Sequence, residues 1–115
     1  MEEFEEAYAS ILNMPHAVAV NSGSSANLIA LQCLMELKLI KAGDEVIVPA
    51  VSWSTSYYPL YQYGLKLKFV DIDLDTLNYD LDELKKSITK KTRAILCVNV
   101  LGNPNDFSKI KQIIK

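Results

Sequence analysis

Histidine and cysteine are nearly absent from this 115-residue sequence, and their scarcity excludes several kinds of site. His16 is the only histidine, and Cys33 and Cys97 are the only cysteines. His16 follows a proline and lies away from the strand ends at which ligands of a parallel sheet bind, so we interpret it as structural. No Ser-His-Asp triad, Cys-His pair or histidine-based metal centre can then be assembled from this sequence. Both cysteines lie in apolar runs, where a free buried thiol is the usual interpretation.

Charge of one sign and long apolar runs are also missing. The formal net charge is −2, so the sequence does not indicate a basic surface that would bind nucleic acid. The most apolar helical stretch, residues 28–34, is interrupted by Gln32 and is too short to cross a bilayer. The N-terminus has no secretory apolar region, and no glycosylation sequon occurs. We expect a cytoplasmic protein that binds neither nucleic acid nor membrane.

The acidic run Asp71, Asp73 and Asp75 has the spacing of a calcium loop but lacks its remaining parts. The EF-hand pattern requires glycine where this chain has Thr76 and glutamate where it has Asp82. A solvated turn explains the run better, and we predict no metal site.

Short apolar runs alternate with segments of helical spacing along the whole chain. Helices are predicted at 2–12, 25–40 and 54–63, after the capping residue Asp80, and from Phe107 onward. Strands are predicted at 17–20, 45–48, 67–70 and 94–98. Such alternation predicts a three-layer α/β/α fold with a mostly parallel sheet. The chain stops inside a predicted helix, so we expect residues 1–115 to be a truncated part of a larger domain.

Ligands of parallel sheets bind beyond the carboxyl ends of the strands, which directs attention to the loops that follow them. The loop Asn21-Ser22-Gly23-Ser24-Ser25 leads into a helix, where small residues, hydroxyl groups and the helix dipole suit a phosphate. A serine-capped helix after a glycine turn is the plainer interpretation of this loop taken alone.

Two other strand-end loops contain candidate ligand-binding side chains. Trp53, the only tryptophan, could stack on a flat ring, although an indole closing the core is the plainer interpretation. Asn99 and Asn103 offer hydrogen-bond donors and acceptors in a loop that also reads as an ordinary Gly-Asn-Pro turn.

Taken together, these loops resemble the DegT/DnrJ/EryC1/StrS family of pyridoxal-phosphate-dependent aminotransferases that act on nucleotide sugars. The resemblance covers nearly the whole chain in order and spacing. It is carried by Val18–Leu28, Gly43–Ala50, Phe69–Asp73 with Thr76–Asn78, and Leu101–Pro104. It implies part of the large domain of a fold-type-I transferase, spanning residues 1–115.

The resemblance also implies a cofactor site for pyridoxal 5'-phosphate. Ser24 and Ser25, after Gly23, match the phosphate-binding pair at the helix start, where family members usually have Gly-Thr-Ala. Trp53 matches the aromatic residue that stacks on the cofactor ring. Asn99 stands where many members have histidine, close to cofactor or substrate. The catalytic lysine, the acidic partner of the pyridine nitrogen and the C-terminal domain would lie beyond Lys115, so no catalytic residue is assigned here.

Several functions remain open at this point. The resemblance implies a nucleotide-sugar substrate, an amino donor and a homodimer for the intact enzyme, with this fragment itself inactive. A sister branch contains the CDP-4-keto-6-deoxyhexose 3-dehydrases, in which histidine replaces the lysine that binds the cofactor. Trp53 modestly favours the aminotransferase branch. Two other hypotheses remain. The chain could be a non-catalytic α/β module that binds a phosphate-bearing ligand at residues 22–25, or a fragment without function.

Overall fold

The computed structural model describes residues 1–115 and has a three-stranded parallel sheet at its centre. Strand β1 (Glu45–Pro49) lies between β2 (Lys66–Val70) and β3 (Thr92–Ile95). β1 pairs with both neighbours in the parallel direction, with Ile47 opposite Lys68 on one side and Ile95 on the other. All three carboxyl ends therefore lie at the same edge of the sheet.

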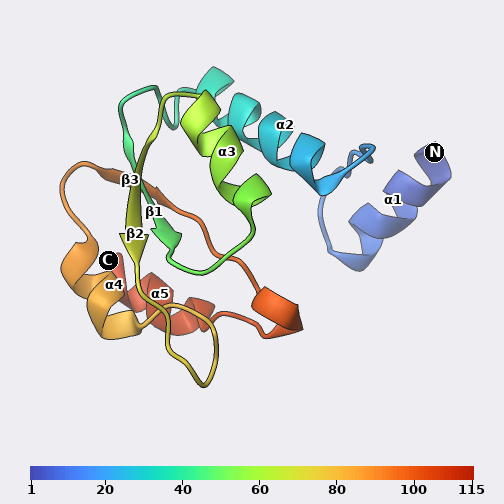
Figure 1. Ribbon diagram of the computed structural model, residues 1–115. Coiled ribbons are helices and arrows are strands. Elements are labelled where there is room, and N and C mark those ends of the chain that lie inside the picture. The colour runs from blue at the N-terminus through green and yellow to red at the C-terminus, as the bar shows by residue number, and fades with distance from the viewer.

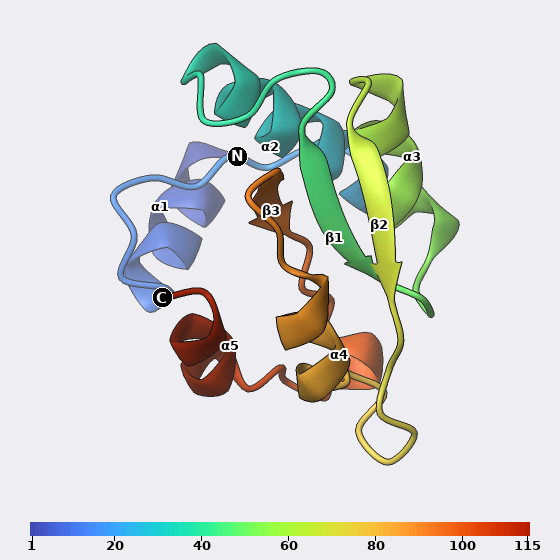
Figure 2. The same ribbon diagram turned by 90° about the vertical axis from the view of Figure 1, so that its left-hand side faces the viewer.

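Helices cover both faces of this sheet, as Figures 1 and 2 show. Helices α2 (Gly23–Glu36) and α3 (Ser54–Gln62) lie on one face, and α4 (Leu81–Ser87) and α5 (Phe107–Ile113) lie on the other. Helix α1 (Glu2–Ile11) lies to the side of the sheet, and a short 3-10 turn, η1 (Val100–Gly102), follows β3. The predicted three-layer α/β/α fold is confirmed.

The continuous apolar sequence of β1 is explained by burial on both faces. Val46 and Val48 face α2 and α3 in a cluster with Ile40, Leu60 and Leu65. Ile47 points to the opposite face, where its cluster contains Val70, Tyr79, Leu84 and Ile110. Ile47 and Val48 are fully buried, and each such side chain stabilises the fold by roughly 1.5–3 kcal/mol relative to exposure.

The predicted strand at residues 17–20 does not form. The segment runs without regular structure, and its one hydrogen bond is from the Ala19 N–H to Glu5 Oε1 of α1, at 2.7 Å. A strand requires a neighbour that satisfies its backbone groups, and no strand of this chain lies beside the segment. The prediction of a strand at these residues is therefore wrong, because an apolar run alone does not supply the neighbouring strand with which it would pair.

The ends of two other elements differ from the prediction. The helix predicted at 25–40 begins at Gly23 and ends at Glu36, because Lys38 adopts a left-handed conformation (φ 58°) that stops it. The strand predicted at 94–98 spans Thr92–Ile95, since beyond the Leu96 N–H to Ile47 carbonyl bond the chain leaves its neighbour.

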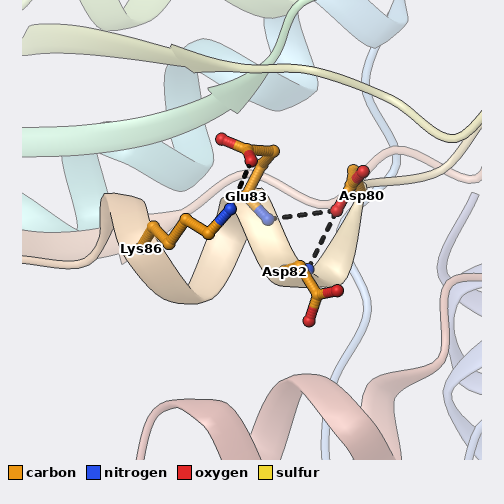
Figure 3. Close-up of polar contacts among 4 residues, drawn as sticks. All are labelled: Asp80, Asp82, Glu83 and Lys86. Carbon is orange, nitrogen blue, oxygen red and sulfur yellow. Dashed lines mark hydrogen bonds and ion pairs between the residues drawn. The ribbon is translucent and has the colours of Figure 1, made fainter.

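The helix that follows Asp80 is capped as predicted, although only half of the capping box forms. Asp80 Oδ1 accepts hydrogen bonds from the N–H groups of Asp82 (2.9 Å) and Glu83 (3.0 Å), as Figure 3 shows. The Glu83 carboxylate pairs with Lys86 at 2.8 Å instead of returning to the Asp80 N–H. That N–H donates to the Asp71 carbonyl, so the second bond of the box is not needed.

The structure also tests the expected burial of the two cysteines and the expectation that no helix crosses a membrane. Cys33 is exposed, which contradicts the expected burial, while Cys97 is partly buried and its burial raises the pKa of the thiol. Every helix is too short, or too polar, to cross a membrane.

Candidate cofactor site

The first turn of α2 presents hydrogen-bond donors that have no acceptor within the chain. Ser22 caps the helix, because its Oγ accepts the N–H of Ser25 at 3.2 Å. Ser25 Oγ in turn donates to Asn21 Oδ1 at 2.6 Å, so the Ser25 hydroxyl is engaged within the loop. The N–H groups of Gly23 and Ser24, and the Ser24 hydroxyl, have no acceptor in the chain. These three donors are available to an anion at a helix N-terminus.

Glycine at position 23 keeps the approach to these donors open. A Cβ placed on Gly23 would meet no atom within 4 Å, so the space beside the backbone is empty. No positive φ is needed at this residue, and its backbone can be adopted by any amino acid. Glycine at this position therefore leaves open a space that a side chain would occupy.

The start of α3 lies next to the start of α2. Asn27 Nδ2 on α2 donates to the Thr55 carbonyl on α3 at 3.3 Å, which joins the first turns of the two helices. Trp53 occupies the N-cap position of α3, makes no capping hydrogen bond, and has 75% of its surface exposed. The indole is therefore not a core side chain, and a flat aromatic face is available beside the α2 donors.

The two helix starts share an electrostatic character that the other helices lack. Neither α2 nor α3 has an acidic residue in its first turn. By contrast, α1 begins with three glutamates, α4 is capped by Asp80, and α5 is capped by Asp106. The partial positive charge at each helix N-terminus is thus left unneutralised only where α2 and α3 begin. An anion finds its best local environment there.

A tyrosine fixes the turn between β1 and Trp53. Tyr57 donates from its hydroxyl to the Pro49 carbonyl at 2.6 Å and packs edge-on against Phe69, with ring centroids 5.5 Å apart. Burial raises the pKa of Tyr57, so the phenol stays a neutral donor. The adjacent Ser52 Oγ is buried without a hydrogen-bond partner. This turn sets the position of the indole relative to the strand end.

Asn99 follows β3 and is held by a residue that the sequence reasoning missed. Asn99 is exposed, and its Oδ1 accepts both the backbone N–H and the Nδ2 of Asn105, each at 3.0 Å. Asn105 is only 6% exposed, and its Nδ2 also donates to the Val98 carbonyl at 2.9 Å. A buried asparagine after a proline gives no periodic signal in the sequence, so only the structure reveals this role.

The loops at 71–80 and 99–105 are joined by two further asparagines. Asn103 Nδ2 donates to the Thr76 carbonyl at 2.6 Å, and Asn78 Nδ2 donates to the Pro104 carbonyl at 3.0 Å. Asp73 closes its own turn, and the bond from the Thr76 N–H lowers the pKa of the Asp73 carboxyl. We call these two cross-loop bonds the asparagine latch. It borders an open cavity of about 510 Å³ between the two loops and α5.

The five residues singled out from the sequence lie at two adjoining helix starts and in the loop after β3. Gly23, Ser24 and Ser25 form the first turn of α2, and Trp53 precedes α3, whose first turn is bonded to that of α2. Trp53 and Asn99 each lie four residues beyond the ends of adjacent parallel strands, Pro49 and Ile95. No direct contact joins Asn99 to the other four residues.

The fold and this edge define a class: a parallel α/β domain that presents helix N-termini and an exposed indole where such sheets bind phosphate-bearing ligands. The chain belongs to the DegT/DnrJ/EryC1/StrS aminotransferase family, whose model matches residues 1–115.

The chain is similar both to a sugar dehydratase and to a sugar aminotransferase. The chain is 56% identical to GDP-4-keto-6-deoxy-D-mannose 3-dehydratase of Yersinia pseudotuberculosis, over 98% of this chain and 29% of that protein. It is 33% identical to GDP-perosamine synthase of Escherichia coli O157:H7, over 100% of this chain and 30% of that protein.

A solved structure shows the same fold. The E. coli GDP-4-keto-6-deoxy-D-mannose-3-dehydratase with bound hydrated PLP superimposes with a TM-score of 0.95 at 53% identity, covering 98% of this chain and 30% of that one. The predicted fold, part of a fold-type-I transferase large domain, is confirmed by this match. The chain spans about 30% of the length of the curated relatives it matches.

Proposed function

We propose that residues 1–115 are the N-terminal part of the large domain of an enzyme dependent on pyridoxal phosphate, and that they hold the cofactor's phosphate and one face of its ring. The observation that carries this proposal is the pair of adjoining helix starts, free of acidic residues, beside the exposed Trp53. A phosphate ester attached to a flat aromatic ring matches both features at once.

The residues present fit this cofactor in composition and openness. The Gly23 and Ser24 N–H groups and the Ser24 hydroxyl would bind the phosphate, with Ser25 ordering the turn through Asn21 and Ser22. Trp53 would stack on the ring, which is worth about 0.5–1.5 kcal/mol beyond burial. Asn99 would donate a hydrogen bond from its free Nδ2. When bound, the cofactor supplies an electron sink for charge that develops on the substrate.

For the reaction, removal of the 3-hydroxyl from a nucleotide-linked 4-keto-6-deoxyhexose is the better-supported proposal. Identity to the 3-dehydratase is 56%, against 33% to the perosamine synthase, over nearly the same residues. This reverses the preference that Trp53 alone suggested, because the compared dehydratases match the whole segment more closely. Transamination of a similar nucleotide sugar, with an amino donor, is the second candidate.

A second subunit, or the remainder of a longer chain, is part of this proposal. Large apolar side chains are exposed on the N-terminal helices and the segment between them, at Phe4, Ile11, Val18 and Ile29. Surfaces of this kind are normally covered by further structure. A homodimer that covers them is our expectation for the intact enzyme.

The proposal is tested by titrating the chain with pyridoxal 5'-phosphate and following the fluorescence of Trp53, the only tryptophan. Quenching should saturate at lower concentration than with pyridoxal, which lacks the phosphate. Equal quenching by both compounds would contradict the phosphate site. The reaction is decided separately: the intact enzyme, given cofactor, amino donor and GDP-4-keto-6-deoxymannose, should yield a product lacking the 3-hydroxyl, whereas an amino sugar would support transamination.

A further inference from the structure

Asn99 is an exposed side chain with an unusually well-determined orientation. Its Oδ1 accepts two hydrogen bonds from Asn105, one from the backbone N–H and one from Nδ2, both 3.0 Å long. A backbone N–H can only donate, so the atom of Asn99 that meets it must be the amide oxygen. The Asn99 Nδ2 is thereby turned away from Asn105, and it has no acceptor in the chain.

The orientation of Asn105 is determined in the same way. Its Nδ2 lies 2.9 Å from the Val98 carbonyl, which can only accept, so the amide of Asn105 cannot be reversed. Asn105 is 6% exposed and is the only buried polar residue of the chain. Backbone groups at both ends thus fix a short series of hydrogen bonds from Val98 through Asn105 to Asn99.

The surrounding loop is held in a conformation that it would not adopt freely. Leu101 has a left-handed backbone (φ 52°), is 93% exposed, and is followed by Gly102 at φ 83°. A left-handed leucine costs about 1–2 kcal/mol, and its exposed side chain offers no packing in return. Bonds from Gly102 N–H to the Asn99 carbonyl and from Asn105 to the Asn99 side chain hold this turn.

We infer that Asn105 is a positioning residue, which presents the Nδ2 of Asn99 as an oriented donor to an oxygen acceptor on the aromatic ring of the bound cofactor. The inference rests on the proposed function for the identity of the ligand. The sheet topology supports this inference. Trp53 lies four residues after the end of β1, and Asn99 lies four residues after the end of the neighbouring strand β3. An ordered donor loses less conformational entropy on binding than a freely rotating one.

Two isosteric substitutions separate the positioning role from a purely structural one. Asn99→Asp keeps an oxygen for both Asn105 donors but removes the outward Nδ2. It should leave the melting temperature nearly unchanged and weaken ring-ligand binding about tenfold. Asn105→Asp removes the Nδ2 donor and places a carboxylate against the Val98 carbonyl and Asn99 Oδ1. Only the bond from the backbone N–H of residue 105 to Asn99 Oδ1 then remains, so the Asn99 side chain should become more mobile and binding should weaken as well.

The experiment is a nuclear magnetic resonance titration of the ¹⁵N-labelled chain with pyridoxine 5'-phosphate, which has the ring and phosphate but no aldehyde to react with lysines. The Asn99 side-chain NH₂ signals should show restricted motion in the free chain and shift on titration. Inorganic phosphate alone should shift the Gly23 and Ser24 amides without moving the Asn99 NH₂. Asn103→Ala, which removes one of the two bonds of the asparagine latch but none of the Asn105 bonds, is the matched control and should retain the Asn99 response.

The outcomes for this inference and for the proposed function are distinguishable. If the ligand shifts Gly23, Ser24 and the Trp53 indole but not the Asn99 NH₂, the inference is overturned and the cofactor site stands. An Asn99 NH₂ that is equally ordered in Asn105→Asp would also overturn it. If the ligand shifts none of these groups, the proposed cofactor site fails as well.

Discussion

At the scale of single residues, the most consequential side chain is Trp53, because its exposure separates binding from folding. We expect Trp53→Ala to lower the affinity for pyridoxal phosphate by about two- to tenfold, which corresponds to the loss of a ring contact of roughly 0.5–1.5 kcal/mol. The free energy of unfolding should change little, since the indole is 75% exposed and leaves no cavity. Isothermal titration and thermal unfolding measure the two effects.

Trp53→Phe serves as the control for this substitution and should retain most of the affinity, because phenylalanine also offers a flat face. Unchanged affinity together with a much lower melting temperature in Trp53→Ala would show that the indole contributes to the core.

Asp80 gives a second prediction at this scale. Asp80→Ala removes the acceptor of two N–H groups at the start of α4 and should lower the free energy of unfolding by about 1 kcal/mol. Glu83→Ala should change it by less than about 0.5 kcal/mol, since it breaks only an exposed ion pair with Lys86. Urea unfolding compares the two variants. An equal loss of unfolding free energy in both would show that Asp80 is not the residue that caps α4.

At the scale of elements, Tyr79 joins β1 to the residue that follows β3, on the face of the sheet that α4 and α5 cover. It is 4% exposed, and its hydroxyl donates to the Leu96 carbonyl at 2.7 Å and contacts the Ile47 carbonyl at 3.3 Å. Tyr79→Phe leaves buried carbonyl groups without this donor and should cost about 1–3 kcal/mol in the free energy of unfolding. Tyr61→Phe, at a residue that is 76% exposed, is the control and should be neutral.

The same tyrosine makes stability depend on alkaline pH. Burial raises the pKa of Tyr79 above its ordinary value of 10.0, so the unfolded chain releases this proton before the folded chain does. Its contribution is therefore fully present below pH 10 and is lost as the pH rises from there toward the folded pKa. Unfolding measured from pH 8 to 11 should show a steeper loss in the wild type than in Tyr79→Phe. Parallel profiles would contradict this assignment.

Elements whose formation depends on local sequence could be predicted, and elements that depend on distant partners could not. The strands at 45–48 and 67–70 and the Asp80 cap follow from continuous apolar runs and a carboxylate at a helix start. Residues 17–20 have an equally apolar pattern, yet they lack a neighbouring strand. The loops that contain Trp53 and Asn99 could be located because they follow strand ends. The loop at 21–25 was located from a predicted strand that does not form, but it does lead into a helix as expected. The role of Asn105 could not be predicted, since it arises from contacts that the chain makes only after it turns back on itself.

At the scale of the whole molecule, the chain lacks a lysine suited to covalent attachment of the cofactor. A reactive lysine must be held beside the aldehyde as the free amine. Of the eleven lysines, Lys68 lies mid-strand and its Nζ donates to the Ser87 carbonyl at 2.6 Å, away from the strand-end edge. We expect borohydride reduction of the chain with pyridoxal phosphate to label several lysines, each incompletely. Mass spectrometry of the peptides measures this, and one lysine labelled to completion at low cofactor excess would refute the prediction.

Residues 12–22 connect α1 to α2 without forming a helix or a strand, and this determines where a protease should cut the chain first. Proteases bind their substrates as extended backbone with free N–H and carbonyl groups, and this connector is exposed along most of its length. Limited trypsin treatment has no lysine or arginine to cut there, so chymotrypsin or thermolysin is the suitable reagent. First cleavage should fall between Leu12 and Val20 and release α1 as a peptide. The α/β core from α2 onward should persist much longer, and early cuts within β1 would mean that the sheet opens before the connector is reached.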